Sequence, residues 1–358
     1  MKIVLVHDSF TQAGGAERVM DILHDFFPQA AVYTLVLDKK LQSKYQDWKI
    51  NLTWLQFFYN LLPKLQYWLF FMPWAVGSIK ISEADVVLSS SSGFVKNIKV
   101  PKNAVHINYC HTPTRFLWVN SEYLGQEVFW LLRPLVKVFL RAIKPWDYKG
   151  AQRVNFFVAN SREVQKRIKQ IYNRESEIIY PPIDTGFWHA TRPKQNYFLL
   201  AGRLQAHKKS EFVVECFNRL GLALHVVGTG RQEKYLKSIA KPNITFFGRV
   251  SDNDLRNEYS GAKALIYPQI EDFGLMPLEA ASCGTATIAF AKGGALETVK
   301  EGQTGEFFEE YNQDKIMDMI LQWKTDKYLS GVLRSHAQQF NILSFKEQIL
   351  KFINAKSI

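Results

Sequence analysis

Short apolar runs alternate with amphipathic segments along most of the chain. In the N-terminal half these runs predict buried strands at 2–6, 31–36, 85–90, 104–109, 154–159 and 177–182. In the C-terminal half they predict strands at 196–202, 223–228, 243–248, 263–268 and 285–290. Continuous β-branched and aromatic runs separated by helical patterns are typical of parallel sheets covered on both faces. The pattern therefore predicts an α/β protein with two doubly wound parallel-sheet domains, which bind ligands at the carboxyl ends of their strands.

A proline-rich segment around Pro181 and Pro182 separates the two halves. We expect an N-terminal Rossmann-like domain over 1–183 and a C-terminal one over 184–340. Residues 341–358 should form a helix that crosses back to the N-terminal domain. A chain of 358 residues can bury a separate core in each half.

The chain is basic, with 45 Lys and Arg against 33 Asp and Glu, a net charge of +12. Such an excess indicates an anionic partner, which leaves nucleic acid, an acidic membrane face and phosphorylated small molecules open. The three cysteines, Cys110, Cys216 and Cys283, are far apart and suit a reducing cytosol. No secretory leader is expected, because the first apolar run gives way at once to polar residues.

Aromatic residues are concentrated between 54 and 79, where Lys64 is the single charge. Pro63 and Pro73 interrupt this stretch, and a spanning helix needs about 20 uninterrupted apolar residues, so we expect no bilayer span. We expect short helices that are partly packed on their own domain and partly dipped into a membrane interface. The large side chains concerned are Trp54, Phe57, Phe58, Trp68, Phe70, Phe71 and Trp74.

A second unusual stretch covers 126–146 and carries Arg133, Lys137, Arg141 and Lys144 at spacings of four, four and three. This spacing places the cations on one helical face, as in a helix that lies on an anionic membrane. An ordinary core helix with a solvated side explains the same spacing, so both interpretations stay open. The clustering of both stretches in one half favours a membrane surface over nucleic acid as partner.

The strongest chemical signal follows the predicted strand 263–268. Glu271 lies in the loop, Pro277 suits the first turn of a helix, and Glu279 follows eight residues after Glu271. Phe273, Gly274 and Leu275 lie between them and offer backbone N–H groups at a helix N-terminus. Two carboxylates so placed can accept hydrogen bonds from two polyols, although helix-dipole preference alone also favours acidic residues there.

A pair of cations follows the predicted strand 196–202. Arg203 and Lys208 can hold the two phosphates of a nucleotide and stabilise a leaving diphosphate without a metal. Lys209 is adjacent to Lys208 and is the less favoured of the two lysines. Each cation taken separately could equally be an ordinary surface residue.

The N-terminal half offers weaker signals at strand ends. Gly14 and Gly15 open a helix and expose N–H groups toward the predicted inter-domain crevice, and His111 ends a strand. Asp8 lies near the end of the first strand, in a position suited to an acceptor. The triplet 252–254 imitates an Asp-x-Asp metal motif, but it follows Ser251, so we interpret it as helix capping and expect no metal site.

Taken in order, these motifs closely resemble the retaining glycosyltransferases of family 4. The matching segments are GGAERV, CHTPTRFLW, VANSREVQKRI, IIYPPIDT, AGRL with the lysine pair, VGTG, FFGRVSD and the E-x7-E pair. The resemblance covers nearly the whole chain and implies a GT-B fold, with two Rossmann-like domains facing a crevice. Within the family the chain looks most like the mannosyltransferases of bacterial O-antigen and exopolysaccharide synthesis, the WbaZ-like branch.

The resemblance also implies roles for individual residues. Glu271 would contact the donor sugar, Glu279 the ribose, and Arg203 with Lys208 the diphosphate. His111 would approach the sugar, and Gly14 and Gly15 would lie near the phosphate. The backbone of Gly248, Arg249 and Val250 would border the base.

The implied activity is metal-independent hexosyl transfer with retention, from GDP-mannose, to a lipid-diphosphate-linked saccharide at the cytoplasmic face of the cell membrane. A UDP-sugar donor is the alternative within this fold. Double displacement needs a carboxylate close behind the anomeric carbon. Asp8 looks placed for the acceptor instead, so the same-face reaction that the resemblance implies suits the chain better. A nicotinamide enzyme should show G-x-G-x-x-G after a strand, which neither half does.

Overall fold

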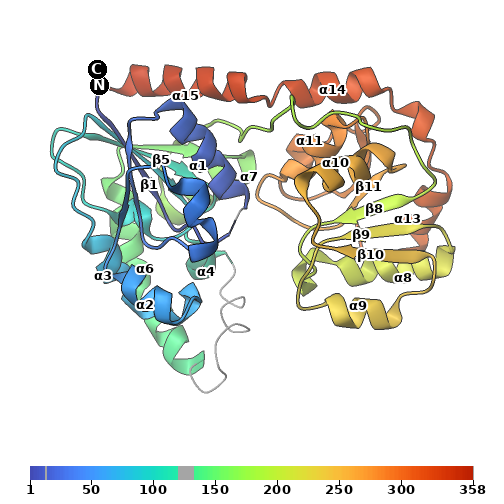
Figure 1. The fold of residues 1–358 in the computed structure, drawn as a ribbon, viewed down its shortest axis with the longest axis horizontal. Helices are drawn as coiled ribbons and strands as arrows, with labels where there is room; N and C mark the ends of the chain where they lie inside the picture. Colours follow the sequence, from blue (N-terminus) through green and yellow to red (C-terminus); the bar gives the residue numbers. More distant parts are fainter. Residues whose placement is uncertain (13, 120–132, 358) are drawn as a thin grey trace. The chain divides into compact units, whose positions relative to one another are not determined.

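The structure is a computed structural model and describes residues 1–12, 14–119 and 133–357. It divides into two compact units, one made of 1–180 with 346–358 and the other of 181–345 (Figure 1). The last helix, α15 (Ile342–Lys356), supplies the C-terminal part of the first unit. Among its contacts there, Lys346 lies over the Phe26 ring and Lys356 pairs with Glu177.

The first unit contains a seven-stranded parallel sheet in the order β3-β2-β1-β4-β5-β6-β7. Its strands are β1 (Ile3–His7), β2 (Ala31–Thr34), β3 (Ile50–Leu52), β4 (Val86–Ser91), β5 (Val105–Cys110), β6 (Phe156–Ala159) and β7 (Ser176–Ile178). Its helices are α1 (Gly15–Phe26), η1 (Lys39–Tyr45), α2 (Leu55–Leu61), η2 (Leu65–Phe71), α3 (Met72–Gly77), η3 (Val95–Asn97), α4 (Arg115–Trp118), α6 (Arg133–Arg153) and α7 (Arg162–Tyr172).

The second unit contains a six-stranded parallel sheet in the order β10-β9-β8-β11-β12-β13. Its strands are β8 (Phe198–Ala201), β9 (Leu224–Val227), β10 (Ile244–Gly248), β11 (Leu265–Tyr267), β12 (Thr287–Phe290) and β13 (Gly305–Phe308). Its helices are η5 (Ala206–Lys208), α8 (Ser210–Leu220), α9 (Glu233–Ile239), α10 (Asp252–Gly261), α11 (Leu275–Ser282), α12 (Ala295–Thr298), α13 (Gln313–Leu321), η6 (Thr325–Lys327) and α14 (Ser330–Gln338).

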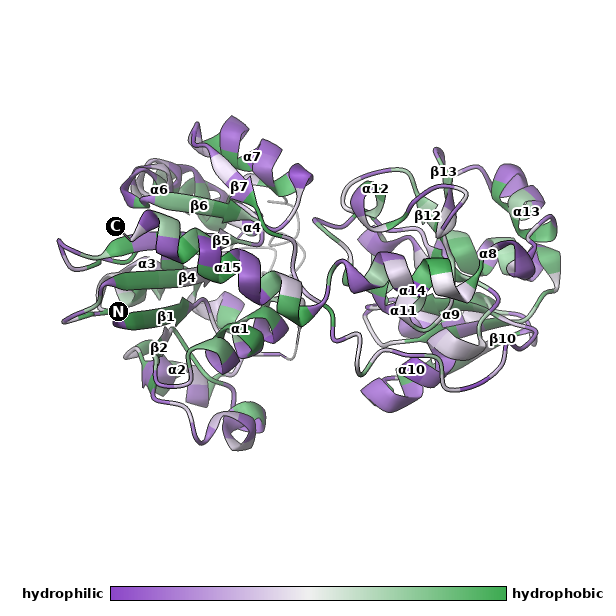
Figure 2. Cartoon of the chain, turned by 90° about the horizontal axis from the view of Figure 1, so that it is seen from above, coloured by the Kyte–Doolittle hydropathy of each residue, from purple (hydrophilic) through white to green (hydrophobic). Residues whose placement is uncertain are grey.

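The predicted α/β class with two doubly wound parallel sheets is confirmed. Central strands such as β4 and β8 are buried along their whole length, which explains their runs of apolar or small residues. Figure 2 shows the same contrast, with β1 and β4 hydrophobic and α10 hydrophilic. The sequence patterns missed the edge strands β3 and β13, because each is short and partly exposed and so lacks a continuous apolar run.

One face of the first sheet packs on α2, η2, α3 and α6, in a cluster that includes Leu55, Leu69 and Leu140. A buried ion pair between Lys96 and Asp147 fastens α6 to η3. The Asp147 carboxylate also accepts hydrogen bonds from the hydroxyls of Thr114 and Tyr172. Burial alone would raise the pKa of Asp147, but the adjacent Lys96 charge, helped by hydrogen bonds from Lys96, Trp118 and Thr114, lowers it.

Candidate functional site

The order of the second sheet reverses between β8 and β11, and such a switch point is where open α/β sheets bind ligands. The loop after β8 carries Arg203 and Lys208, and the loop after β11 carries Glu271. The two loops that sequence reasoning singled out therefore leave adjacent strands at the switch point.

The structure brings two of the predicted residues into direct contact. The Lys208 ammonium forms an ion pair with the Glu271 carboxylate, and both side chains are largely buried, at 14% and 24% exposed. Lys209 has a left-handed backbone with φ of 57° and directs its ammonium over the Tyr311 ring instead. Of the lysine pair, Lys208 is thus the one that contacts Glu271, and its role as the phosphate ligand stays a prediction.

Arg203 is exposed, and within the described part of the chain no carboxylate pairs with it. Its guanidinium is therefore available to a ligand, while the Lys208 charge is already partly neutralised by Glu271. An incoming polyanion would compete with Glu271 for Lys208 and meet Arg203 without such competition.

The helix that follows Glu271 begins as the sequence predicted. Gly274 is its N-cap, with φ of 87°, and Leu275 is its first residue. A Cβ at Gly274 would lie 2.6 Å from the Tyr267 hydroxyl, so only glycine fits this turn. Glu279 is buried in α11, at 4% exposed, and accepts a hydrogen bond of 3.1 Å from the Tyr259 hydroxyl.

Close backbone packing at the same edge was missed by sequence reasoning. A Cβ on Gly228 would lie 1.8 Å from the Gly202 carbonyl oxygen, and one on Gly294 would lie 2.1 Å from the Phe273 carbonyl oxygen. The loops after β9 and β12 therefore press directly on the loops that carry Arg203 and Glu271. The available signals were the glycines of VGTG and AKGG after predicted strands.

Gly248 ends β10 with φ of 66°, and Arg249 and Val250 follow it toward α10. The Gly248 carbonyl accepts a hydrogen bond from the Gly228 amide. The capping interpretation of 252–254 is confirmed, because the Ser251 hydroxyl accepts a hydrogen bond from the Asp254 amide at the start of α10. Over the described ranges, no cluster of His, Cys, Asp or Glu has the arrangement of a metal site.

In the first unit, Gly14 and Gly15 stand at the start of α1 as predicted. The Gly14 amide already donates to the Glu17 carboxylate at 3.1 Å, which closes off one of the N–H groups expected to face a phosphate. Their part in donor binding stays a prediction.

His111 follows the last residue of β5 and is 8% exposed. Its Nε2 lies 2.8 Å from the Ser90 hydroxyl. Burial, with smaller contributions from His7 and Arg115, lowers the pKa of His111 to about 3. The imidazole is therefore neutral at pH 7, and it can take part in hydrogen bonds but cannot serve as a cationic acid.

Asp8 has a structural role in the described chain. Its carboxylate accepts hydrogen bonds from the backbone amides of Ser92 and Gly93, both at 2.7 Å, and of Val95 at 3.1 Å. These contacts hold the loop after β4 in place. A carboxylate occupied in this way has little capacity left for an acceptor, and the acceptor role stays a prediction.

The aromatic stretch 54–79 folds as the short segments α2, η2 and α3, as its prolines predicted. Many of its large side chains are exposed: Trp54 41%, Phe57 68%, Phe58 39%, Leu61 65%, Leu62 51%, Tyr67 50%, Phe71 46% and Trp74 65%. Trp68 and Phe70 are half-buried; the Trp68 indole donates to the Leu62 carbonyl, and the Phe70 ring contacts Phe139 of α6. We call the eight exposed side chains given with their percentages the aromatic patch; the half-buried Trp68 and Phe70 are not part of it.

The basic stretch 126–146 is described from 133 onward, and 126–132 lie outside the described residues. Arg133, Lys137 and Arg141 are exposed on α6. The prediction that Lys144 continues this stripe is wrong, because Lys144 is half-buried and its ammonium lies 4.7 Å from the centre of the Trp118 ring. The spacing of three keeps Lys144 on the same side of α6, but there its ammonium is engaged by the Trp118 ring of α4. No helix in the described ranges is both long enough and apolar enough to cross a membrane.

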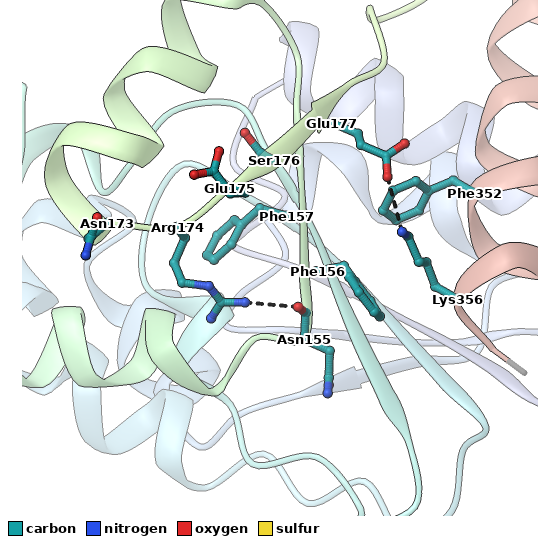
Figure 3. A pocket seen from close by; sticks show the side chains of 10 residues that line it. All are labelled: Asn155, Phe156, Phe157, Asn173, Arg174, Glu175, Ser176, Glu177, Phe352 and Lys356. Carbon is teal, nitrogen blue, oxygen red and sulfur yellow. Dashed lines mark hydrogen bonds and ion pairs between the residues drawn. The ribbon is translucent and has the colours of Figure 1, made fainter.

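A pocket of about 430 Å³ lies elsewhere in the first unit, between β6, β7 and the end of α15 (Figure 3). Arg174 and the Glu177–Lys356 pair line it. It borders Asn155 and Ser176, at the amino ends of their strands. Parallel sheets bind ligands at the opposite edge, so this pocket is not the candidate site.

Comparison with known proteins agrees with placing the candidate site in the second unit. Residues 187–340 match the family model described as Glycosyl transferases group 1. The O-antigen chain mannosyltransferase RfbU of Salmonella typhimurium is 28% identical over 164 residues, which are 42% of this chain and 46% of RfbU. A GDP-mannose-dependent monoacylated alpha-(1-6)-phosphatidylinositol monomannoside mannosyltransferase of Corynebacterium glutamicum is 32% identical over 29% of this chain and 30% of its own.

The whole fold is similar to that of Anabaena Alr3699/HepE in its crystal structure with UDP, with a TM-score of 0.74, 17% identity, and coverage of 99% of this chain and 100% of the other. The chain spans less than half the length of RfbU and of the other curated relative named here. The protein has the GT-B fold, and residues 187–340 of its second unit match the group 1 glycosyltransferase model.

Proposed function

We propose that the protein is a retaining, metal-independent glycosyltransferase that moves a hexose from a nucleotide sugar to a saccharide on a lipid diphosphate, in the synthesis of surface polysaccharide. The observation that supports this best is the Lys208–Glu271 ion pair at the switch point of the second sheet, inside the segment that matches the family model. It joins a cation for phosphate to a carboxylate for sugar hydroxyls.

The proposed reaction needs charge neutralisation more than acid–base chemistry. When the bond between the anomeric carbon and the phosphate oxygen breaks, negative charge develops on the diphosphate, and Arg203 and Lys208 would stabilise it. The acceptor hydroxyl then forms the new bond to the anomeric carbon on the same face and passes its proton to a diphosphate oxygen. Glu271, released from Lys208 by the diphosphate, would accept hydrogen bonds from the sugar hydroxyls.

For the donor we propose GDP-mannose, with a UDP-sugar as the alternative. The mannosyltransferases among the similar sequences support the first, and the likeness to a protein crystallised with UDP and with UDP-glucose supports the second. The buried Glu279, proposed to hold the ribose, would serve either donor because both nucleotides carry the same ribose hydroxyls.

Thermal-shift measurements with a panel of nucleotides test the donor site, because a ligand that binds the folded state raises the midpoint of unfolding. We expect GDP or UDP to stabilise the protein and the adenine and cytosine nucleotides to do so less. Transfer should continue in EDTA, and Asp252→Ala should leave it intact, since that carboxylate lies at the capped start of α10. Full loss of transfer in EDTA would contradict the metal-independent reaction.

We further propose that the enzyme is peripheral at the cytoplasmic face of the cell membrane. The aromatic patch supports this, since monomeric proteins rarely expose such a concentration of large apolar side chains. Phe70, the half-buried neighbour of the patch residue Phe71, contacts Phe139 of α6. The exposed cations of α6, Arg133, Lys137 and Arg141, suit anionic lipid headgroups. A membrane so bound would present a lipid-linked acceptor to the enzyme.

A further inference from the structure

The first sheet has its own switch point, between β1 and β4, where three polar side chains meet. β1 and β4 pair in a register that sets His7 opposite Ser90. β4 and β5 pair with Ser90 opposite Tyr109, so that His111, two residues further on, lies on the same face of the sheet. His7, Ser90 and His111 therefore cluster at the carboxyl edge, where a ligand of this unit would bind.

These three side chains form a short hydrogen-bonded chain. The Ser90 hydroxyl lies 2.8 Å from His111 Nε2 and 3.2 Å from His7 Nδ1. A hydroxyl has one proton, so it can donate to only one of the two rings. Hydroxyl donors reach about 2.5–3.0 Å, whereas N–H donors extend to about 3.2 Å. The distances assign Ser90 as donor to His111 Nε2 and His7 Nδ1–H as donor to Ser90.

Both imidazoles are neutral in this environment. Burial lowers the pKa of His7, against opposing contributions from Asp8 and Asp21, and burial lowers that of His111 to about 3. A neutral imidazole carries its proton on one nitrogen only, and the hydrogen bond at the other nitrogen decides which. Because His111 Nε2 accepts from Ser90, the proton of His111 is on Nδ1. No described residue accepts a hydrogen bond from that Nδ1.

We propose that Ser90 and His7 are positioning residues that fix the tautomer of His111, so that its Nδ1–H donates a hydrogen bond to a ligand oxygen at the carboxyl edge of the first sheet. The identity of that oxygen, a sugar hydroxyl, rests on the proposed function. The tautomer itself does not depend on it and can be measured without substrate.

The chain contains a matched control on the opposite face of the same strands. Ser89 lies 2.8 Å from His106 Nε2, both residues are buried, and burial lowers the pKa of His106 to about 3 as well. His106 stands near the beginning of β5, away from the carboxyl edge. Ser89→Ala therefore removes an equivalent hydrogen bond without touching the proposed cluster.

The direct test is the ¹⁵N NMR spectrum of the full chain with labelled histidines, since ring nitrogens with and without a proton differ widely in chemical shift. We expect His111 at pH 7 to be neutral with its proton on Nδ1. In Ser90→Ala, the proton of His111 should redistribute between its two ring nitrogens. In Ser89→Ala, only the ¹⁵N shifts of His106 should change, and those of His111 should stay as in the wild type. A wild-type His111 that is protonated on Nε2, or is an imidazolium at pH 7, overturns the assignment.

A kinetic comparison tests whether the tautomer matters for transfer. Ser90→Ala should lower kcat/KM about fivefold or more, as expected for one misdirected hydrogen bond, and Ser89→Ala should change it less than about twofold. Equal losses in the two variants would reduce Ser90 to a structural residue and contradict the positioning role. If no nucleotide sugar supports transfer, the proposed function fails, but the NMR result still decides the tautomer.

Discussion

Replacing the most exposed aromatic residues of the patch should weaken membrane binding while leaving the fold of the protein intact. Phe57 and Trp74 are 68% and 65% exposed, so Phe57→Ser with Trp74→Ser removes two large apolar groups that contribute little to the core. An aromatic side chain buries roughly 200 Å², so two-thirds of it is about 130 Å². At about 25 cal/mol per Å², complete insertion is worth about 3 kcal/mol for each ring.

Partial insertion sets a lower expectation. If each ring enters the interface halfway, the pair contributes about 3 kcal/mol, which is a loss of about 100-fold in the partition coefficient of the double variant. Arg133→Gln, Lys137→Gln and Arg141→Gln remove three exposed cations, each worth about 1 kcal/mol near an anionic surface. The charge variant should therefore lose most of the salt dependence, whereas Lys144→Gln should retain it, since Lys144 packs on Trp118.

Flotation with vesicles measures both effects. The wild type should float with vesicles that contain anionic lipid, and less so as salt rises. Leu321→Ser with Leu329→Ser is the matched control, because these leucines are 63% and 65% exposed but belong to the second unit. If the wild type stays at the bottom beside anionic vesicles at low salt, or if the Phe57 and Trp74 variant floats like the wild type, the membrane interpretation of the patch is wrong.

Three further predictions concern the candidate site and the buried pair. Lys208→Ala should lower kcat/KM about 100-fold, while Lys209→Ala, whose ammonium lies over Tyr311, should change it less than about threefold in the same transfer assay. Glu271→Gln should also slow transfer but tighten the calorimetric binding of a nucleoside diphosphate, because it removes the carboxylate that competes for Lys208; weaker binding would contradict this competition. Lys96→Met should lower the free energy of unfolding by about 3–5 kcal/mol at pH 7, since Asp147 is left buried and charged. Without the Lys96 ammonium, burial raises the pKa of Asp147. The difference in the free energy of urea unfolding between the wild type and Lys96→Met should therefore shrink as the pH falls through that raised pKa. A difference that does not change with pH would point to lost packing instead.

The sequence predicted the features that depend on local patterns. Buried strands such as β4 have continuous apolar or small residues, and the start of α11 is marked by Gly274 and Pro277. Since parallel strands end at one edge of a sheet, Arg203, Lys208 and Glu271 could be assigned to a common edge from their places after strands. The choice of Lys208 over Lys209 as the phosphate ligand rested on the family resemblance and stays a prediction; in the structure, the Lys209 ammonium lies over the Tyr311 ring instead.

Features that depend on contacts between distant segments could not be predicted in the same way. The carboxylate of Asp8 is occupied by amides more than eighty positions away, and Lys144 packs on a ring of another helix. The contact of Gly294 with the Phe273 backbone likewise requires knowing that the loops after β11 and β12 are neighbours. The hydrogen-bonded chain through Ser90 depends on the register of three strands, which apolar runs do not specify.

The most direct test of the central claim is product analysis after incubation of the protein with a nucleotide sugar and a lipid-diphosphate-linked saccharide in EDTA. We predict transfer of one hexose with retained anomeric configuration, an α-linked mannose from GDP-mannose, and its loss by about 100-fold in Lys208→Ala. Transfer with inversion, transfer that Lys208→Ala leaves unchanged, or no transfer from either GDP-mannose or UDP-sugars would contradict the proposed chemistry at the Lys208–Glu271 pair.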